Sequence, residues 1–127
     1  ALVLANANLT FDGGAEINAC ASYAAITVSM ADFDYWSDQH SSISVKNGDL
    51  KINATLDGKA TNGPTGPWAS SASGAFVFNN GYAPVTLKLD VAKGSDVTIN
   101  ADSSANKSGP FAAFASATQE STAAYNL

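Results

Sequence analysis

The feature that most constrains the fold of this chain is an alternation of apolar and polar residues with a period of two, repeated in short segments. The first segment spans residues 1–11, where the apolar side chains share one face: Val3, Ala5, Ala7, Leu9 and Phe11. Such alternation is typical of half-buried β-strands. Since no segment shows a convincing apolar stripe at helical spacing, the sequence predicts an all-β protein.

Turn-forming residues separate the later alternating segments. Asn47-Gly48 lies between two such runs, and because both residues tolerate positive φ, it is a strong signal for a β-hairpin. Residues 79–84 and 93–96 are further turns, and residues 111–118 are an Ala-rich last strand. About seven or eight short strands with regular turns predict an antiparallel β-sandwich.

The composition restricts the class of protein. A length of 127 residues predicts one domain, with residues 12–127 as the sandwich and residues 1–11 as a separate N-terminal strand. The net charge is −5, with six lysines and no arginine, which argues against nucleic-acid binding. Charged residues make up only 13% of the chain, against about 25% in an average protein. Such a weakly charged surface favours an extracellular location.

The N-terminus supports a secreted protein. The one methionine is the internal Met30, so we expect the chain to begin after a processing step such as signal-peptide removal. No segment approaches the roughly 18 consecutive apolar residues of a membrane span. Cys20 cannot form an internal disulfide, so either the compartment is reducing or the protein is extracellular and stable by other means. We expect Cys20 to be a small buried side chain or, in an assembly, to meet Cys20 of another chain.

Three N-x-[ST] sequons begin at Asn8, Asn53 and Asn106. In a secreted protein each is a candidate for N-glycosylation. Asn8 and Asn53 alternate with apolar neighbours, so both are expected to face solvent.

Two groups of side chains resemble ligand or catalytic sites. Asp32, Asp34 and Asp38 lie in one short segment, and calcium is the cofactor that such oxygen ligands would hold. The favoured interpretation is nevertheless a solvated acidic loop and a protein with no cofactor. His40 precedes two serines, but no nucleophile elbow is present and adjacent residues in a strand face opposite ways. We therefore expect a surface histidine and no enzyme.

The aromatic residues suggest an alternative function. Trp36 and Trp68, together with Tyr35 and Tyr82, fall in or beside turn-rich segments. Aromatic side chains at such positions of a sandwich can stack on sugar rings. A monomeric carbohydrate-binding module that uses Trp36 and Trp68 is therefore the alternative to a structural role, unless Trp68 fills one end of the core.

Residues 76–91 resemble a known pattern. Phe76-Val77-Phe78-Asn79-Asn80-Gly81-Tyr82-Ala83-Pro84-Val85-Thr86-Leu87-Lys88-Leu89-Asp90-Val91 is similar to the strand–turn–strand of secreted prokaryotic β-sandwich domains. These include archaeal surface-filament subunits of the pilin type and camelysin-like biofilm fibre proteins. The expected turn of the camelysin pattern contains a proline, whereas this chain has Ala92-Lys93-Gly94-Ser95-Asp96.

The resemblance implies an Ig-like or pilin-like subunit of an extracellular filament. In several such filaments the N-terminal strand of one subunit fills a groove in the next, so the same role would fall to residues 1–9. The residues expected to enter the neighbour are Leu2, Val3, Leu4, Ala5, Ala7 and Leu9. Copies of the chain itself are then the partners. Two alternative functions remain: the carbohydrate-binding module described above, and a virion or surface-layer decoration protein.

Overall fold

The computed structural model describes residues 2–21, 24–29, 36–56, 73–80, 85–102 and 111–118. These residues form ten β-strands and no helix, which confirms the prediction of an all-β protein. Accordingly, this part of the chain offers no helix with the length and hydropathy that a bilayer crossing requires.

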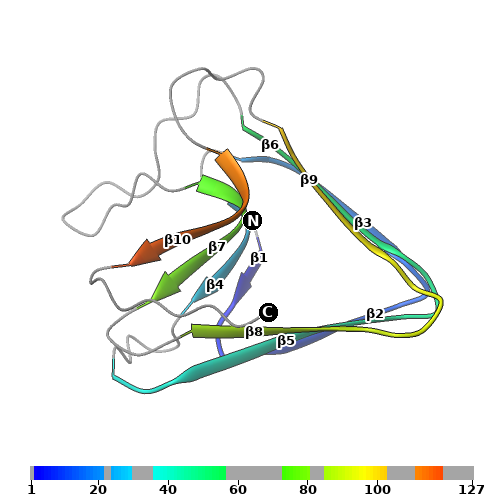
Figure 1. The fold of residues 1–127 in the computed structure, drawn as a ribbon, viewed down its shortest axis with the longest axis horizontal. Helices are drawn as coiled ribbons and strands as arrows, with labels where there is room; N and C mark the ends of the chain where they lie inside the picture. The colour runs from blue at the N-terminus through cyan, green and yellow to red at the C-terminus, as the bar shows by residue number, and fades with distance from the viewer. Residues whose placement is uncertain are drawn as a thin grey trace.

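The strands lie in three sheets, and the chain visits the sheets in rotation (Figure 1). Sheet A contains β1 (Leu2–Leu4), β4 (Ala24–Ser29), β7 (Ser73–Asn80) and β10 (Phe111–Thr118). Sheet B contains β2 (Asn8–Asp12), β5 (Gln39–Lys46) and β8 (Val85–Val91). Sheet C contains β3 (Ala15–Ala21), β6 (Leu50–Leu56) and β9 (Val97–Asp102). All paired strands are parallel.

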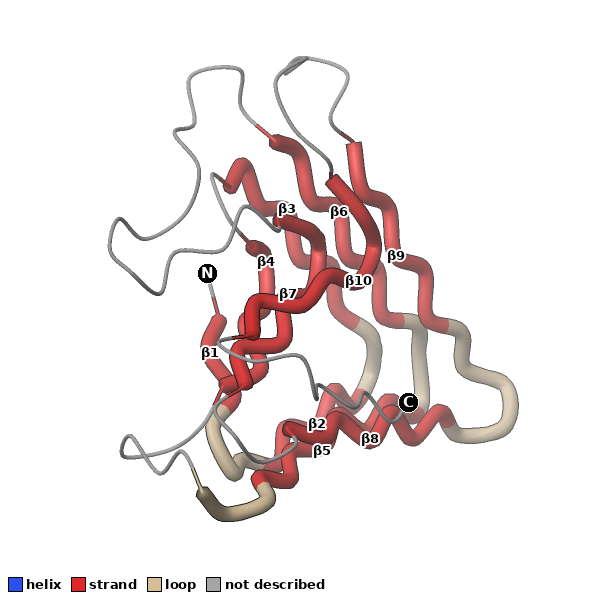
Figure 2. Tube along the Cα trace, turned by 60° about the vertical axis from the view of Figure 1, so that its left-hand side comes forward, coloured by secondary structure: helices blue, strands red, loops and turns tan. Residues whose placement is uncertain are grey.

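The three sheets enclose a triangular cross-section (Figure 1). Three consecutive strands, one from each sheet, complete one coil, and the next coil stacks on it through parallel pairing (Figure 2). This is the architecture of a parallel β-helix, in which each coil contacts only its neighbours along the axis.

The antiparallel β-sandwich predicted from the sequence is therefore wrong. Alternation shows that one face of a strand is buried, but it does not specify the neighbouring strand or its direction. The Asn47-Gly48 turn illustrates this, because it joins β5 of sheet B to β6 of sheet C and makes no hairpin. A residue with positive φ, such as Asn47 at 57°, serves a corner between two sheets as well as a tight hairpin.

The corners between sheets B and C stack on one another along the axis. Gly13 N–H donates to the Lys46 carbonyl at 3.0 Å, and Ala15 N–H donates to the Asp49 carbonyl at 2.9 Å. A Cβ added at Gly48 would lie 2.5 Å from the Gly14 nitrogen, so this close approach of two corners requires glycine.

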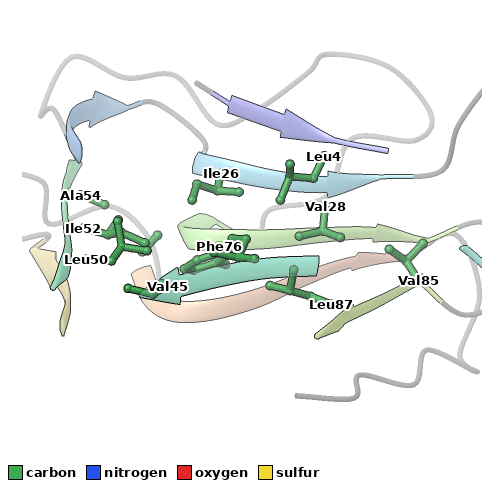
Figure 3. Packing of buried hydrophobic residues seen from close by; sticks show 12 residues of the cluster. Leu4, Ile26, Val28, Val45, Leu50, Ile52, Ala54, Phe76, Val85 and Leu87 are labelled. Carbon is green, nitrogen blue, oxygen red and sulfur yellow. The ribbon is translucent and has the colours of Figure 1, made fainter. Parts of the chain in front are cut away.

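The core fills the space between the three sheets (Figure 3). Strand register aligns inward residues in columns that run along the axis, for example Ile17, Ile52 and Ile99 in sheet C. Ile26, Ile43 and Ile52 of the middle coil are completely buried. Burial of this kind supplies most of the free energy that holds the coils together.

Two features of the architecture were missed in the sequence. Strand β3 was not predicted, although Ala15, Ile17 and Ala19 alternate with polar residues and mark it. The coil repeat was also missed, because aligned residues are unevenly spaced: Asn18 and Asn53 are 35 positions apart, whereas Asn53 and Asn100 are 47 apart. A search for one fixed period fails on such a chain.

Candidate functional site

The candidate site is the pair of open ends of the β-helix. In the described part of the chain, β1, β2 and β3 have a strand neighbour on one side only and form the N-terminal end. In the same way β8, β9 and β10 form the C-terminal end. A sheet edge with unpaired backbone groups is a template for pairing with another chain.

Burial falls from the middle coil towards both ends in two apolar columns, whereas Leu4 of β1 and Val85 and Leu87 of β8 are buried although their strands lie at the ends. In one column of sheet C, Ile52 is fully buried while Ile17 and Ile99, on either side of it, are only half-buried. In sheet B, Ile43 is fully buried while Leu9 and Leu89 are half-buried. These two apolar columns therefore continue to both ends, where a further coil would bury their last residues completely.

Phe114 on β10 continues the column of sheet A. It follows Leu2, Ile26 and Phe76 in register and stacks on the Phe76 ring, with 5.2 Å between the ring centroids and 21° between the planes. Phe76 is buried, but Phe114 is 36% exposed. The C-terminal end thus carries an aromatic side chain that is only partly covered.

The first eleven residues do not form the single strand expected from their alternation. They form β1 and β2, which lie in different sheets and are separated by a corner with Asn6 at a φ of 47°. The corner changes which side chains face inward. Leu4 is buried, whereas Val3, expected on the apolar face, is 59% exposed. Ala5, Ala7 and Leu9 are half-buried, as is Leu2.

Both strands pair within their own chain. Leu2–Leu4 pairs with Ile26–Val28 of β4, and Asn8–Asp12 pairs with Ser42–Lys46 of β5. The corner is tied to the same chain as well, because His40 N–H donates to Asn6 Oδ1 at 2.9 Å and Ser41 Oγ accepts from Ala7 N–H at 3.2 Å. In this structure residues 2–12 therefore complete the first coil of their own molecule.

Three asparagines form a ladder on the outer face of sheet C. Asn53 Nδ2 donates to Asn18 Oδ1 at 2.8 Å, and Asn100 Nδ2 donates to Asn53 Oδ1 at 2.7 Å. Asn53 Nδ2 also donates to Glu16 Oε1 at 2.9 Å. The ladder has a direction, since the amide nitrogens of Asn53 and Asn100 both donate to the amide oxygen of the preceding coil.

The ladder affects the expected glycosylation sites. Asn53 is half-buried and its amide nitrogen donates two hydrogen bonds, so the expectation of a solvent-facing Asn53 is only partly met. Asn8 is exposed as expected, and its Oδ1 accepts from Ser42 Oγ at 2.6 Å. Asn106 lies outside the described residues.

An open hollow of about 490 Å³ lies on sheet B. Its lining combines hydroxyl, amide, imidazole, ammonium and carboxylate groups with one leucine: Asn8, His40, Ser41, Ser42, Thr86, Leu87, Lys88 and Asp90. His40 is exposed, as expected. Trp36, shortly before β5, is 76% exposed. The other aromatic residues expected to stack on sugar rings, Trp68, Tyr35 and Tyr82, lie outside the described residues.

Of the predicted calcium ligands, Asp38 is exposed, and Asp32 and Asp34 lie outside the described residues. Within the described ranges no group of three or more His, Cys, Asp or Glu side chains is arranged to hold a metal ion. Cys20 is exposed on β3, so the expectation of a buried thiol is wrong. Its position in the strand places it on the outer face, two residues after Asn18.

One carboxylate at a corner is electrostatically perturbed. A hydrogen bond from Asn47 and a second from Lys46 lower the pKa of Asp12 below its ordinary value of 3.8. The distances are 2.8 Å from Asn47 Nδ2 and 3.1 Å from Lys46 Nζ. Both donors come from the second coil, so the ionised Asp12 links two successive corners.

Comparison with protein-family models, curated protein sequences and solved structures gives no match for this chain. The resemblance to surface-filament subunits therefore stays a prediction. What the chain does has to be argued from its own geometry.

Proposed function

We propose that this protein is a structural component of an extracellular assembly, in which copies of the β-helix stack end to end. The single observation that carries the proposal is the incomplete burial of Ile17 and Ile99, and of Leu9 and Leu89, in columns whose middle residues Ile52 and Ile43 are fully buried. Stacking one C-terminal end on the N-terminal end of the next copy would bury Ile99, Leu89 and their counterparts as fully as Ile43 and Ile52. Head-to-tail contacts of this kind do not close on themselves and produce a filament.

The outer faces of the two ends are compatible with stacking in register. Continuing the columns of sheets B and C would place Asn8 of the second copy over Lys88 and Glu16 over Thr98. It would also place Asn18 over Asn100, where an amide nitrogen meets an amide oxygen, as in the ladder within the chain. No like charges face each other in these columns, so the contact carries no direct repulsion.

The extracellular location is supported by the composition. Charged residues make up 13% of the chain, and arginine is absent. A surface with few charges gives little repulsion between identical copies, which favours self-association.

The native Cys20 allows a direct test of the register. Cys20, Thr55 and Asp102 form one column, so Cys20 and Asp102 of one chain are two strands, or about 10 Å, apart and too far for a disulfide. In a stack, Cys20 of one copy lies next to Asp102 of the preceding copy. We expect Asp102→Cys to form disulfide-linked multimers under mild oxidation, seen on a non-reducing gel.

Thr98→Cys is the matched control, because it lies on the same outer face but four residues out of register. It should not cross-link. Negative-stain electron microscopy of the unmodified protein should show fibres. Particles that stay single at high concentration, with no multimers from Asp102→Cys, would refute the proposal.

The hollow on sheet B favours a second candidate function, the binding of a saccharide. Its hydroxyl, amide and charged groups match the hydrogen bonds that sugar hydroxyls need, and Trp36 is exposed near the start of β5. A pull-down on insoluble polysaccharides tests this candidate. Binding that His40→Ala weakens, and that Lys51→Ala on sheet C leaves unchanged, would support it; no retention of the unmodified protein would exclude it.

A further inference from the structure

The number of strands in each sheet has a consequence for the proposed stack. Among the described residues, sheet A contains four strands, whereas sheets B and C contain three each. A continuous stack of three-coil units needs three strands of every copy in each sheet. One strand of sheet A is therefore surplus at every junction.

The surplus arises from β1 and β10. When β2 and β3 of the next copy continue sheets B and C beyond β8 and β9, the β1 of that copy falls at the level already occupied by β10. Two strands cannot occupy one place, so one of them has to leave.

We propose that β10 of one copy takes the place of β1 of the next copy, and that β1 is displaced. This inference rests on the proposed end-to-end stacking and identifies the strand that joins the copies. The exchanged strand is then the C-terminal one, rather than residues 1–9 as the sequence suggested.

Length and pairing favour β10 over β1. β10 has eight residues and pairs with β7 through seven of them. β1 has three residues, all paired with β4. Displacing β1 thus breaks a much shorter ladder, and the loss is made good when the neighbour's β10 pairs with β4.

The side chains of the shared column support the same choice. In this column Leu2 lies next to Ile26, and Phe114 lies next to Phe76 at the other end. In the stack Phe114 would take the place of Leu2 against Ile26 of the next copy. Its ring already stacks on Phe76 and is still 36% exposed, so one aromatic side chain would fill the column between two molecules.

Cysteine pairs on the Cys20→Ser background distinguish which strand is exchanged. Val3, Thr27, Val77 and Ala115 share one column of sheet A. Within one chain Thr27 and Ala115 are two strands apart, and so are Val3 and Val77, so neither pair can form an intramolecular disulfide. Between stacked copies, Thr27→Cys with Ala115→Cys cross-links only if β10 lies against the next copy's β4.

We expect multimers from Thr27→Cys with Ala115→Cys. A control pair, Thr27→Cys with Ala117→Cys, lies two residues out of register and should give none. Multimers from Val3→Cys with Val77→Cys would mean that β1 keeps its place and β10 leaves, which would overturn the inference. If Asp102→Cys also gives no multimers, the stacking proposal itself fails, so the two failures are distinguishable.

Deletion of residues 1–4 provides a second test without cysteines. Because β1 has to leave before copies join, this deletion should shorten the lag before fibres appear, as measured by light scattering. Leu4→Asp, which weakens the docking of β1 without shortening the chain, should act in the same direction. Loss of fibres in both variants, with the strand content by circular dichroism unchanged, would contradict the exchange.

Discussion

At the scale of single residues, the corners between sheets B and C depend on a few polar atoms and glycines. Asp12 accepts hydrogen bonds from Asn47 and Lys46, and these contacts connect two successive coils. Ser95 has a similar role, because its buried Oγ accepts from Gly48 N–H at 3.3 Å. The stacking of corners is therefore held by specific side chains as well as by the backbone.

The lowered pKa of Asp12 predicts a contribution to acid stability. A group whose pKa is lower in the folded state stabilises the fold above its unfolded pKa, near 3.8, and loses that effect as the pH falls through the folded value. Asp12→Asn should therefore be less stable than the unmodified protein at neutral pH, with the difference disappearing in strong acid. Chemical denaturation at several pH values measures this.

An NMR titration of Asp12 gives an independent check. Since the bond from Asn47 is the largest cause of the shift, Asn47→Ala should move the pKa of Asp12 back towards 3.8. If the free energy of unfolding of Asp12→Asn and of the unmodified protein changed with pH in the same way, Asp12 would not stabilise the fold through its lowered pKa.

Gly48 predicts a steric effect at the same corner. A Cβ at this position would come within 2.5 Å of the Gly14 nitrogen and 2.6 Å of the Gly13 carbonyl carbon, and both are backbone atoms of the preceding corner. Gly48→Ala should therefore lower the free energy of unfolding by about 1–3 kcal/mol. Gly94→Ala is an informative comparison, since an added Cβ there meets nothing within 4 Å and only the positive φ of 87° opposes it. Equal losses in the two variants would exclude a steric cause.

At the scale of elements, the coils differ in how well their inward side chains are covered. Ile17, Ile52 and Ile99 are the same residue in one column, so they report the effect of position alone. Ile52→Ala should cost about 2–5 kcal/mol, as is usual for a fully buried isoleucine, and Ile17→Ala and Ile99→Ala about half as much in the monomer. Denaturation of dilute protein tests this gradient, and equal costs at all three positions would show that the ends are covered.

The asparagine ladder predicts a separation of folding from assembly. Asn18→Asp keeps the oxygen that accepts from Asn53 but removes the amide nitrogen that would donate to Asn100 of the preceding copy. The variant should therefore assemble less well while the monomer keeps its strand content. Sedimentation measures assembly and circular dichroism measures folding; unchanged assembly would show that the ladder does not continue between copies.

At the scale of the whole molecule, end-to-end stacking couples stability to concentration. Only folded chains stack, so association stabilises the folded state by mass action. The midpoint of thermal unfolding should rise as the protein concentration is increased over the range in which fibres form. A midpoint that is independent of concentration, together with a monomeric sedimentation profile, would contradict a polymer.

Much of the local structure could be predicted from the sequence. Apolar and polar residues alternate in residues 50–56 and 85–91, which predicts two strands; Leu50, Ile52 and Leu87 are buried as this pattern predicts, whereas Val91 at the end of β8 is exposed. Asn47-Gly48 was correctly predicted as a turn. These features depend on neighbours one or two positions away, which a linear pattern records directly.

The candidate site could not be predicted in the same way. The alternation in residues 1–11 predicts one donor strand, but the corner at Asn6 divides this segment between two sheets. A polar residue in an alternating run is equally consistent with a corner. The asparagine ladder and the open ends depend on residues 35 and 47 positions apart that meet only after coiling.

The alternating pattern of the sequence is enough to predict β-strands, the turns at positions 47–48 and 93–96, and many of the inward side chains. It does not contain the parallel direction of the strands, their coiling into three sheets, or the strand edges that have no neighbour within the described residues. Alternation depends on the side chains within one strand, whereas the partner and direction of a strand depend on packing against neighbouring coils whose residues are far apart in the chain.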